Sequence, residues 1–309
     1  LYGGAIGIAL LANRLNAVYE ATADRSALQT AILQPLSELT FEASDDQRLR
    51  WWRDQPLGLI GCGGILLGLQ ILGRRSWVDT LLKSARSRFI EADQLHDLLG
   101  GCSGLIGPLL QQSSELAVDV ALVAGSHLLE QQQEDGSWSA RGAMKERPGL
   151  LGFSHGTAGY AAALAQLHQA TGEQRFLDGA YAALKYERSN YRAEAGNWPD
   201  FRNASSSNQD SVFMASWCHG APGIGLARAC LWSTALWDDK CLEEISVAIL
   251  TTAETALRNI PRDSLCCGNL GLMVILEALS NGPWAIDQPT IALARDKAAL
   301  IRARVMNKF

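Results

Sequence analysis

The chain has 309 residues, of which 48% are apolar and 19% are charged, and 27 basic against 32 acidic residues give a net charge of −5. This composition supplies a large core, and the mild acidity excludes a bulk electrostatic attraction to nucleic acid or to an anionic membrane. The seven cysteines are an odd number and no signal peptide opens the chain, so we expect reduced thiols in the cytoplasm rather than a disulfide framework.

A recurring motif, Gly-x-x-Gly followed by an apolar run, divides the chain into units. Successive copies begin 57, 40, 55, 64 and 48 residues apart, and each interval is long enough for two helices and their loops. A phosphate-binding role for these glycines would need a preceding strand, and no strand pattern is evident. The copies begin at Gly4, Gly61, Gly101, Gly156, Gly220 and Gly268.

The segments between the motifs read as helices. The uncharged stretch Gln55–Gly73 has the length of a membrane span, but its glycines and its proline favour a buried helix of a core. Apolar residues recur every three or four positions in the stretches that follow, which predicts amphipathic helices. These helices are predicted over Val78–Ile90, Glu115–Gln132 and Arg175–Tyr186.

The last third of the chain adds a loop and a terminal helix to this pattern. The polar, Asn- and Ser-rich stretch Arg188–Ser211 predicts a long loop before the fifth motif. The apolar and basic stretch Thr290–Lys308 predicts a further outer helix. Repeated helix pairs form open solenoids or closed rings. Apolar inner helices surrounded by amphipathic outer ones form an α/α toroid, so we predict an all-α toroid.

Reactive side chains gather at one phase of the repeat. Cys218 lies two residues before a motif glycine, and Cys266 and Cys267 lie two residues and one residue before the next. If the motifs are structurally equivalent, these thiols meet at one end of the ring. Three thiolates in a reducing compartment suit tetrahedral zinc and leave its fourth position open, as in catalytic sites. The alternative is that cysteines are small core residues, which we prefer for Cys62, Cys102, Cys230 and Cys241.

Histidines occupy the same phase of the repeat. His155 and His219 each lie one residue before a motif glycine. An ordinary imidazole pKa near neutrality suits acid–base work beside a metal, although a histidine at a glycine turn is often only a hydrogen-bonding element. His127 and His168 lie inside helical patterns and are expected to be structural or exposed. Asp97 is either a helix cap or a partner of an active-site histidine.

At these residues the chain resembles the LanC-like cyclases, and more specifically the C-terminal cyclase domain of LanM-type (class II) lanthipeptide synthetases. The resemblance covers essentially the whole chain. Trp-Cys-His-Gly, followed some 50 residues later by Cys-Cys-Gly-Asn, is its most specific part. The stronger matches are SHGTAGYAAAL (Ser154–Leu164), SWCHGAPGIGLAR (Ser216–Arg228) and CCGNLGL (Cys266–Leu272), and weaker ones include HDLLGGCSGLIG (His96–Gly107) and NWPDFR (Asn197–Arg202).

The resemblance implies a function and a set of site residues. It implies a toroid with a central zinc ion held by Cys218, Cys266 and Cys267, in the manner of a three-thiolate subgroup. His155 matches the family's catalytic histidine and Asp97 an active-site aspartate, while His219 stands at a position that varies. The substrate implied is a dehydrated precursor peptide, with its leader, supplied by an upstream dehydratase domain of the same synthetase.

Two departures from the family pattern affect the expected extent of the domain. Gly3 stands where many relatives have Asp, and a seventh glycine motif is absent. Because the chain also lacks an initial Met, we expect a single cyclase domain over residues 1–309, part of a larger synthetase and without its final motif.

Other functions use similar features. A LanC-like protein that adds glutathione or another small thiol to dehydrated peptides would use the same site. A prenyltransferase-like toroid normally has Asp and His among its zinc ligands. A zinc-stabilised peptide-binding scaffold would not catalyse a reaction.

Overall fold

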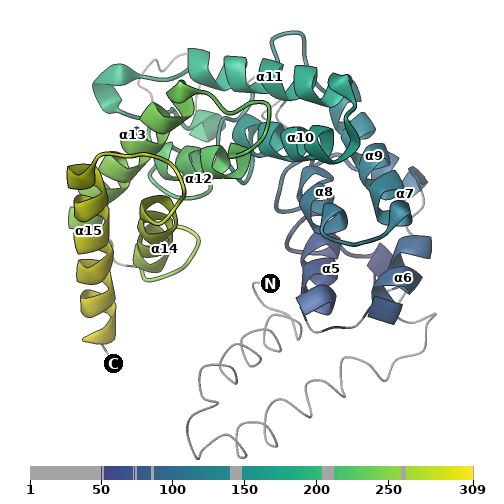
Figure 1. Ribbon diagram of the computed structural model, residues 1–309, viewed down its shortest axis with the longest axis horizontal. Coiled ribbons are helices and arrows are strands. Elements are labelled where there is room, and N and C mark those ends of the chain that lie inside the picture. The colour runs from purple at the N-terminus through teal and green to yellow at the C-terminus, as the bar shows by residue number, and fades with distance from the viewer. Residues whose placement is uncertain are drawn as a thin grey trace, which may run out of the picture. The chain divides into compact units, whose positions relative to one another are not determined.

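The computed structural model describes residues 50, 52–71, 73, 75–84, 87–139, 148–203, 212–258 and 262–308. Within these ranges every regular element is a helix, and extended backbone pairs only in isolated bridges such as Gln132 with Trp138 (Figure 1). The all-α prediction is confirmed. The first glycine motif, at Gly4, lies outside the described residues.

The chain divides into two compact units, Leu1–His127 and Leu128–Phe309. In the first, α5 (Cys62–Ile71) packs against α6 (Arg75–Ser84) and α8 (Ser103–Leu110). Most of α5 is buried, as predicted for the uncharged stretch. No helix among the described residues is long and apolar enough to cross a membrane.

The other helices that begin in this unit lie in predicted amphipathic stretches. The stretch Val78–Ile90 corresponds to α6 together with α7 (Ser87–Glu91). The stretch Glu115–Gln132 corresponds to α9 (Glu115–Glu130), whose last residues belong to the second unit.

The α-helices that begin in the described part of the second unit form three pairs, in which each member packs against the other. The first member of each pair starts directly after a motif glycine, and these three helices pack against one another in series, α10 on α12 and α12 on α14 (Figure 1). The pairs are α10 (Thr157–Thr171) with α11 (Gln174–Ser189), α12 (Ala221–Leu231) with α13 (Asp239–Leu257), and α14 (Asn269–Ser280) with α15 (Gln288–Met306).

Burial distinguishes the two members of a pair, as the sequence pattern predicts. Every residue of α10 from Thr157 to Ala165 is buried, whereas α11 buries only one side. The predicted outer helix near the end of the chain is α15. In the predicted loop after α11, the described residues contain only two short 3-10 turns, η3 (Ala193–Ala195) and η4 (Phe201–Asn203).

A buried ion network ties α12 to its neighbours. The guanidinium of Arg228 is fully buried and binds the carboxylates of Glu187 on α11 and Glu244 on α13. Arg188 joins Glu244 to Asp238 at the start of α13. Removing one partner of such a network leaves a buried charge uncompensated, at a cost of about 3–5 kcal/mol. The network therefore fixes α12, whose N-terminal end carries the candidate site.

Candidate metal centre and active site

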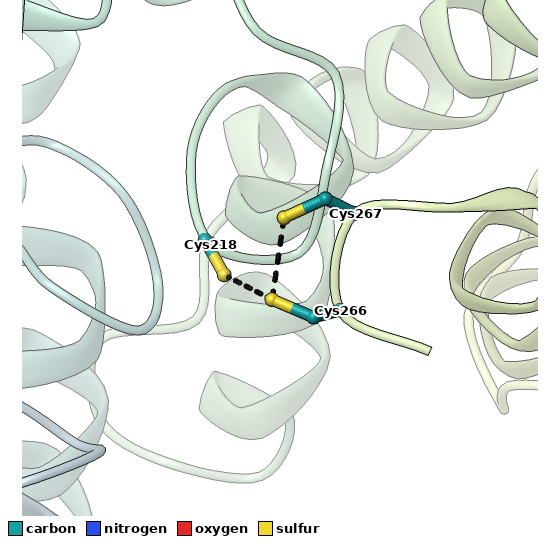
Figure 2. A group of neighbouring side chains, drawn as sticks. All are labelled: Cys218, Cys266 and Cys267. Carbon is teal, nitrogen blue, oxygen red and sulfur yellow. Dashed lines mark hydrogen bonds between the residues drawn. The ribbon is translucent and has the colours of Figure 1, made fainter. Parts of the chain in front are cut away.

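Two turns of the second unit bring three thiols together. Cys218 lies in the turn before α12, and Cys266 and Cys267 lie in the turn before α14. The Sγ of Cys266 is 3.2 Å from the Sγ of Cys218 and 3.2 Å from that of Cys267 (Figure 2). Cys218 is buried and Cys267 is exposed. The thiols that share a phase of the repeat are thus neighbours in space, with one side open.

Glycine makes the tight packing around the turn before α12 possible. Gly220 has φ +86°, in the left-handed region that favours glycine, and a Cβ there would collide with the carbonyl oxygen of Met214. A Cβ on Gly152 would collide with the carbonyl oxygen of Cys218. Gly220 therefore lets the turn before α12 close on itself, and Gly152 lets the turn before α10 pack against its backbone.

The three thiols influence one another's ionisation. Burial is the largest cause of the raised pKa of both Cys218 and Cys267, and the neighbouring Cys266 raises both further. Burial also acts to raise the pKa of Cys266, but hydrogen bonds from the thiols of Cys218 and Cys267 outweigh it, and the net shift is downward. Without a cation, the cluster favours one thiolate stabilised by two thiols.

The donor set suits zinc. Tetrahedral zinc–thiolate bonds of about 2.3 Å place the sulfurs about 3.8 Å apart, so the cluster needs to open by only about half an ångström. A dication removes the repulsion that otherwise prevents three adjacent thiols from ionising together. Three protein ligands leave one tetrahedral position for a substrate.

Two imidazoles lie beside the thiols. The ring of His219, the residue after Cys218, stacks on the ring of His155 with centroids 5.6 Å apart. Burial lowers the pKa of His219 to about 4, although the charge of Asp200 opposes the shift, so His219 is neutral at pH 7. Its Nε2 is buried and has no hydrogen-bond partner among the described residues. The predicted histidines therefore lie together, and one offers an open ring nitrogen.

A polar strap that sequence reasoning left without a role holds this turn; we call Asn197–Arg202 the NWPDFR strap. The side chain of Asn197 donates to the carbonyl of Met214 at 3.0 Å and accepts from the N–H of Ala221 at 2.7 Å. Both partners flank Cys218, so one amide bridges the two ends of its turn. The signal available in the sequence was the weak family match of these six letters.

Asp97 lies in the first unit, in the turn before α8. Its Oδ1 accepts the N–H of Gly100 at 2.6 Å. This contact closes a turn ahead of α8, whose own N-cap is Cys102, so Asp97 does not cap the helix. A role beside an active-site histidine stays a prediction.

A second cluster, in the first unit, was also missed; it consists of Asp93, His96 and His127, and we call it the Asp93 clasp. These residues offer potential ligand atoms within 4.8 Å of one another. The carboxylate of Asp93 accepts the N–H groups of Leu95, His96 and Cys102. The Nε2 of His127 lies 2.8 Å from the carbonyl oxygen of Asp93. These bonds join the loop before α8 to α9, and we interpret the cluster as a loop clasp.

The remaining cysteines are free and lie away from the three-thiol cluster. Burial raises the pKa of Cys62 to about 12 and those of Cys230 and Cys241 to about 11, and it raises that of Cys102 as well. These thiols are therefore poor nucleophiles, in agreement with the core role predicted for them. His168 contacts the carbonyl of Glu173 at the end of α10, in agreement with its predicted structural role.

Comparison with known proteins identifies the family. Residues 1–283 match the family described as "Lanthionine synthetase C-like protein". The chain belongs to this family. Among solved structures it is similar to a nisin cyclase, with 19% sequence identity, a TM-score of 0.62 and coverage of 89% of this chain and 74% of that chain. This likeness confirms the predicted α/α toroid for the LanC-like chain. A search of curated proteins gave no match.

Proposed function

We propose that this LanC-like protein is a zinc-dependent lanthipeptide cyclase. It would add cysteine thiols of a dehydrated precursor peptide to dehydroalanine or dehydrobutyrine, and so form lanthionine and methyllanthionine rings. The observation that carries the proposal is the cluster of Cys218, Cys266 and Cys267, open on the side of Cys267, with two histidines beside it. Membership of the family and the likeness to a nisin cyclase support it.

The three cysteines are the residues that would hold zinc. Zinc bound there supplies the Lewis acidity that keeps a thiol deprotonated, and therefore nucleophilic, at neutral pH. Three thiolates outweigh the two charges of the ion, and this excess of negative charge favours a reactive sulfur. Zinc dependence and a three-thiolate set are parts of this proposal.

The histidines move the protons. As a neutral imidazole, His219 relays the proton that leaves the incoming thiol to water, because its pKa of about 4 does not let it keep the proton at pH 7. The sulfur bonds to the β-carbon of the alkene, whose π electrons move to form an enolate. His155 then donates a proton to the α-carbon. One proton leaves sulfur and one arrives at carbon, so the ring product has the mass of its substrate.

The wider setting is also proposed. The motif resemblance supports a LanM-type synthetase in which a dehydratase domain prepares the peptide, and it implies a catalytic role for Asp97. The free thiols of all seven cysteines suit a reducing cytoplasm.

The test is a count of free thiols on a dehydrated, cysteine-containing peptide incubated with the zinc-loaded protein. Cyclisation removes thiols without a change in mass. Thiol addition to the alkene with a gain of one glutathione mass would favour the small-thiol transferase instead. A peptide that keeps all its thiols would leave only a zinc-stabilised binding scaffold. Zinc per chain, measured on the same sample, shows whether the protein was loaded.

A further inference from the structure

Arg202, the last residue of the NWPDFR strap, is held with one edge of its guanidinium engaged. Its Nε and Nη2 donate to the carboxylate of Asp200, at 3.0 and 2.7 Å, and Nη2 also contacts the sulfur of Met214. The Asp200 side chain is 1% exposed and that of Arg202 is 39% exposed. The Nη1 group has no hydrogen-bond partner among the described residues, so a fixed cation presents a free N–H edge.

Arg202 is joined through its partners to the turn that carries the thiol site. Asp200, which holds Arg202, has its Oδ1 3.9 Å from the Nδ1 of His219. Met214, the other contact, lies in the segment that leads to Cys218 and is bridged to the start of α12 by Asn197. Asp200 and Met214, the two groups that Arg202 contacts, therefore hold the guanidinium at the turn that carries Cys218 and His219.

The ion pair with Asp200 fixes the position and orientation of the Arg202 guanidinium. Burial alone would raise the pKa of Asp200, but hydrogen bonds from Arg202 outweigh it and hold the pKa below its usual range. The carboxylate therefore stays ionised and the fork of Arg202 stays oriented. A lysine could not use one edge for a carboxylate and keep a second planar edge for a substrate.

The reaction of the proposed function develops negative charge at a predictable place. When a thiolate sulfur bonds to the β-carbon of a dehydroamino acid, electrons pass through the α-carbon to the carbonyl oxygen of the same residue. A donor fixed beside that oxygen stabilises the transition state more than the ground state. The polar groups around the thiols include the neutral side chains of Ser154, Ser216 and Trp217. His155, His219 and Arg202 lie there as well, and Arg202 is the permanent cation of this set.

We propose that Arg202 is a catalytic residue that donates its Nη1 edge to the carbonyl oxygen of the dehydroamino acid and stabilises the enolate. The inference rests on the proposed cyclase function. In this proposal the NWPDFR strap binds the electrophile, the dehydroamino acid, whereas the three cysteines activate the nucleophile, the peptide thiol. Since the guanidinium binds this carbonyl oxygen, we expect the substrate to carry a carbonyl group conjugated with its double bond.

The test compares Arg202→Ala, Arg202→Lys and wild type on a synthetic peptide with one cysteine and one dehydroalanine. Loss of one such donor typically lowers kcat by about 10²–10³-fold, so we expect a loss of about 10²-fold in Arg202→Ala with KM changed little. Arg202→Lys should recover only part of the rate. Zinc per chain should match wild type in both variants. Arg192→Ala, in the same loop, is the matched control and should keep the wild-type rate.

Chemical rescue separates a catalytic role from a structural one. Methylguanidinium added to Arg202→Ala should restore part of the lost kcat, and it should not affect wild type. Thiol consumption by Arg202→Ala within about threefold of wild type, or a lost rate that methylguanidinium leaves unchanged, would overturn the role of Arg202 while the cyclase function stands. Equal absence of thiol consumption in zinc-loaded wild type and variant would overturn both.

Discussion

The three-thiol cluster and the Asp93 clasp look alike in the number and spacing of their ligand atoms, since each gathers three potential metal ligands within 4.8 Å. They differ in what those groups already bind. The carboxylate of Asp93 accepts three backbone N–H groups, and a ring nitrogen of His127 is engaged with a backbone carbonyl. The sulfurs of Cys218, Cys266 and Cys267 contact chiefly one another.

Ligand atoms make a metal site only when folding leaves them available. Hydrogen bonds to backbone engage Asp93 and His127 of the Asp93 clasp without an ion, and these bonds stabilise a loop. Ionisation of all three thiols is unfavourable without a cation, because the three negative charges repel one another. A bound dication offsets this repulsion. Occupancy by zinc should therefore separate the two clusters.

The largest effect is expected from Cys266→Ser, because Cys266 is the central member of the thiol cluster. Zinc should fall from about one ion per chain to nearly none, and ring formation should stop. The matched control is Cys230→Ser, which makes the same change on α12 away from the cluster. Plasma emission spectrometry and thiol counting measure the two properties. Full zinc retention in Cys266→Ser would remove this residue from the site.

His155→Ala should lower the rate of ring formation by about 10²–10⁴-fold, because a positioned general acid contributes that much. Zinc content should not change, since His155 is not among the proposed ligands. His168→Ala, at the other end of α10, is the control and should cyclise at the wild-type rate. Single-turnover kinetics on a dehydrated peptide measure the difference. Equal rates for the two variants would exclude His155 as the acid.

Zinc should change hydrogen exchange at one cluster only. Added to metal-free protein, it should slow amide exchange in residues 216–220 and 264–268 by about tenfold or more, because a bound ion stabilises the state that binds it. Residues 93–102 should exchange as before. Mass spectrometry of peptic fragments measures both segments. Equal protection of residues 93–102 would mean that the Asp93 clasp also binds zinc.

The smallest effect is expected from Asp93→Ala. The loss leaves backbone N–H groups without their acceptor and should cost about 1–3 kcal/mol, or several degrees in Tm. Zinc content should stay at the wild-type value. Differential scanning calorimetry together with metal analysis checks both. A loss of zinc without a change in Tm would reverse the interpretation of this cluster.

The sequence by itself determined the helical architecture and the positions of the reactive groups. The apolar periodicity and the glycine motifs predicted the inner helices because a helix start that packs against another turn tolerates no side chain there. The phase of Cys218, Cys266 and Cys267 relative to these glycines predicted their meeting, since equivalent positions of a repeat point to the same end.

The tertiary structure alone decided which polar groups surround that site. Arg202 and Asp200 lie in an aperiodic loop, so no pattern places them beside Cys218. The sequence likewise does not show that a ring nitrogen of His127 contacts a backbone carbonyl, because that carbonyl belongs to Asp93, 34 residues earlier in the chain. Periodicity encodes which face of a helix is buried, whereas a hydrogen bond depends on atoms that distant segments bring within about 3 Å.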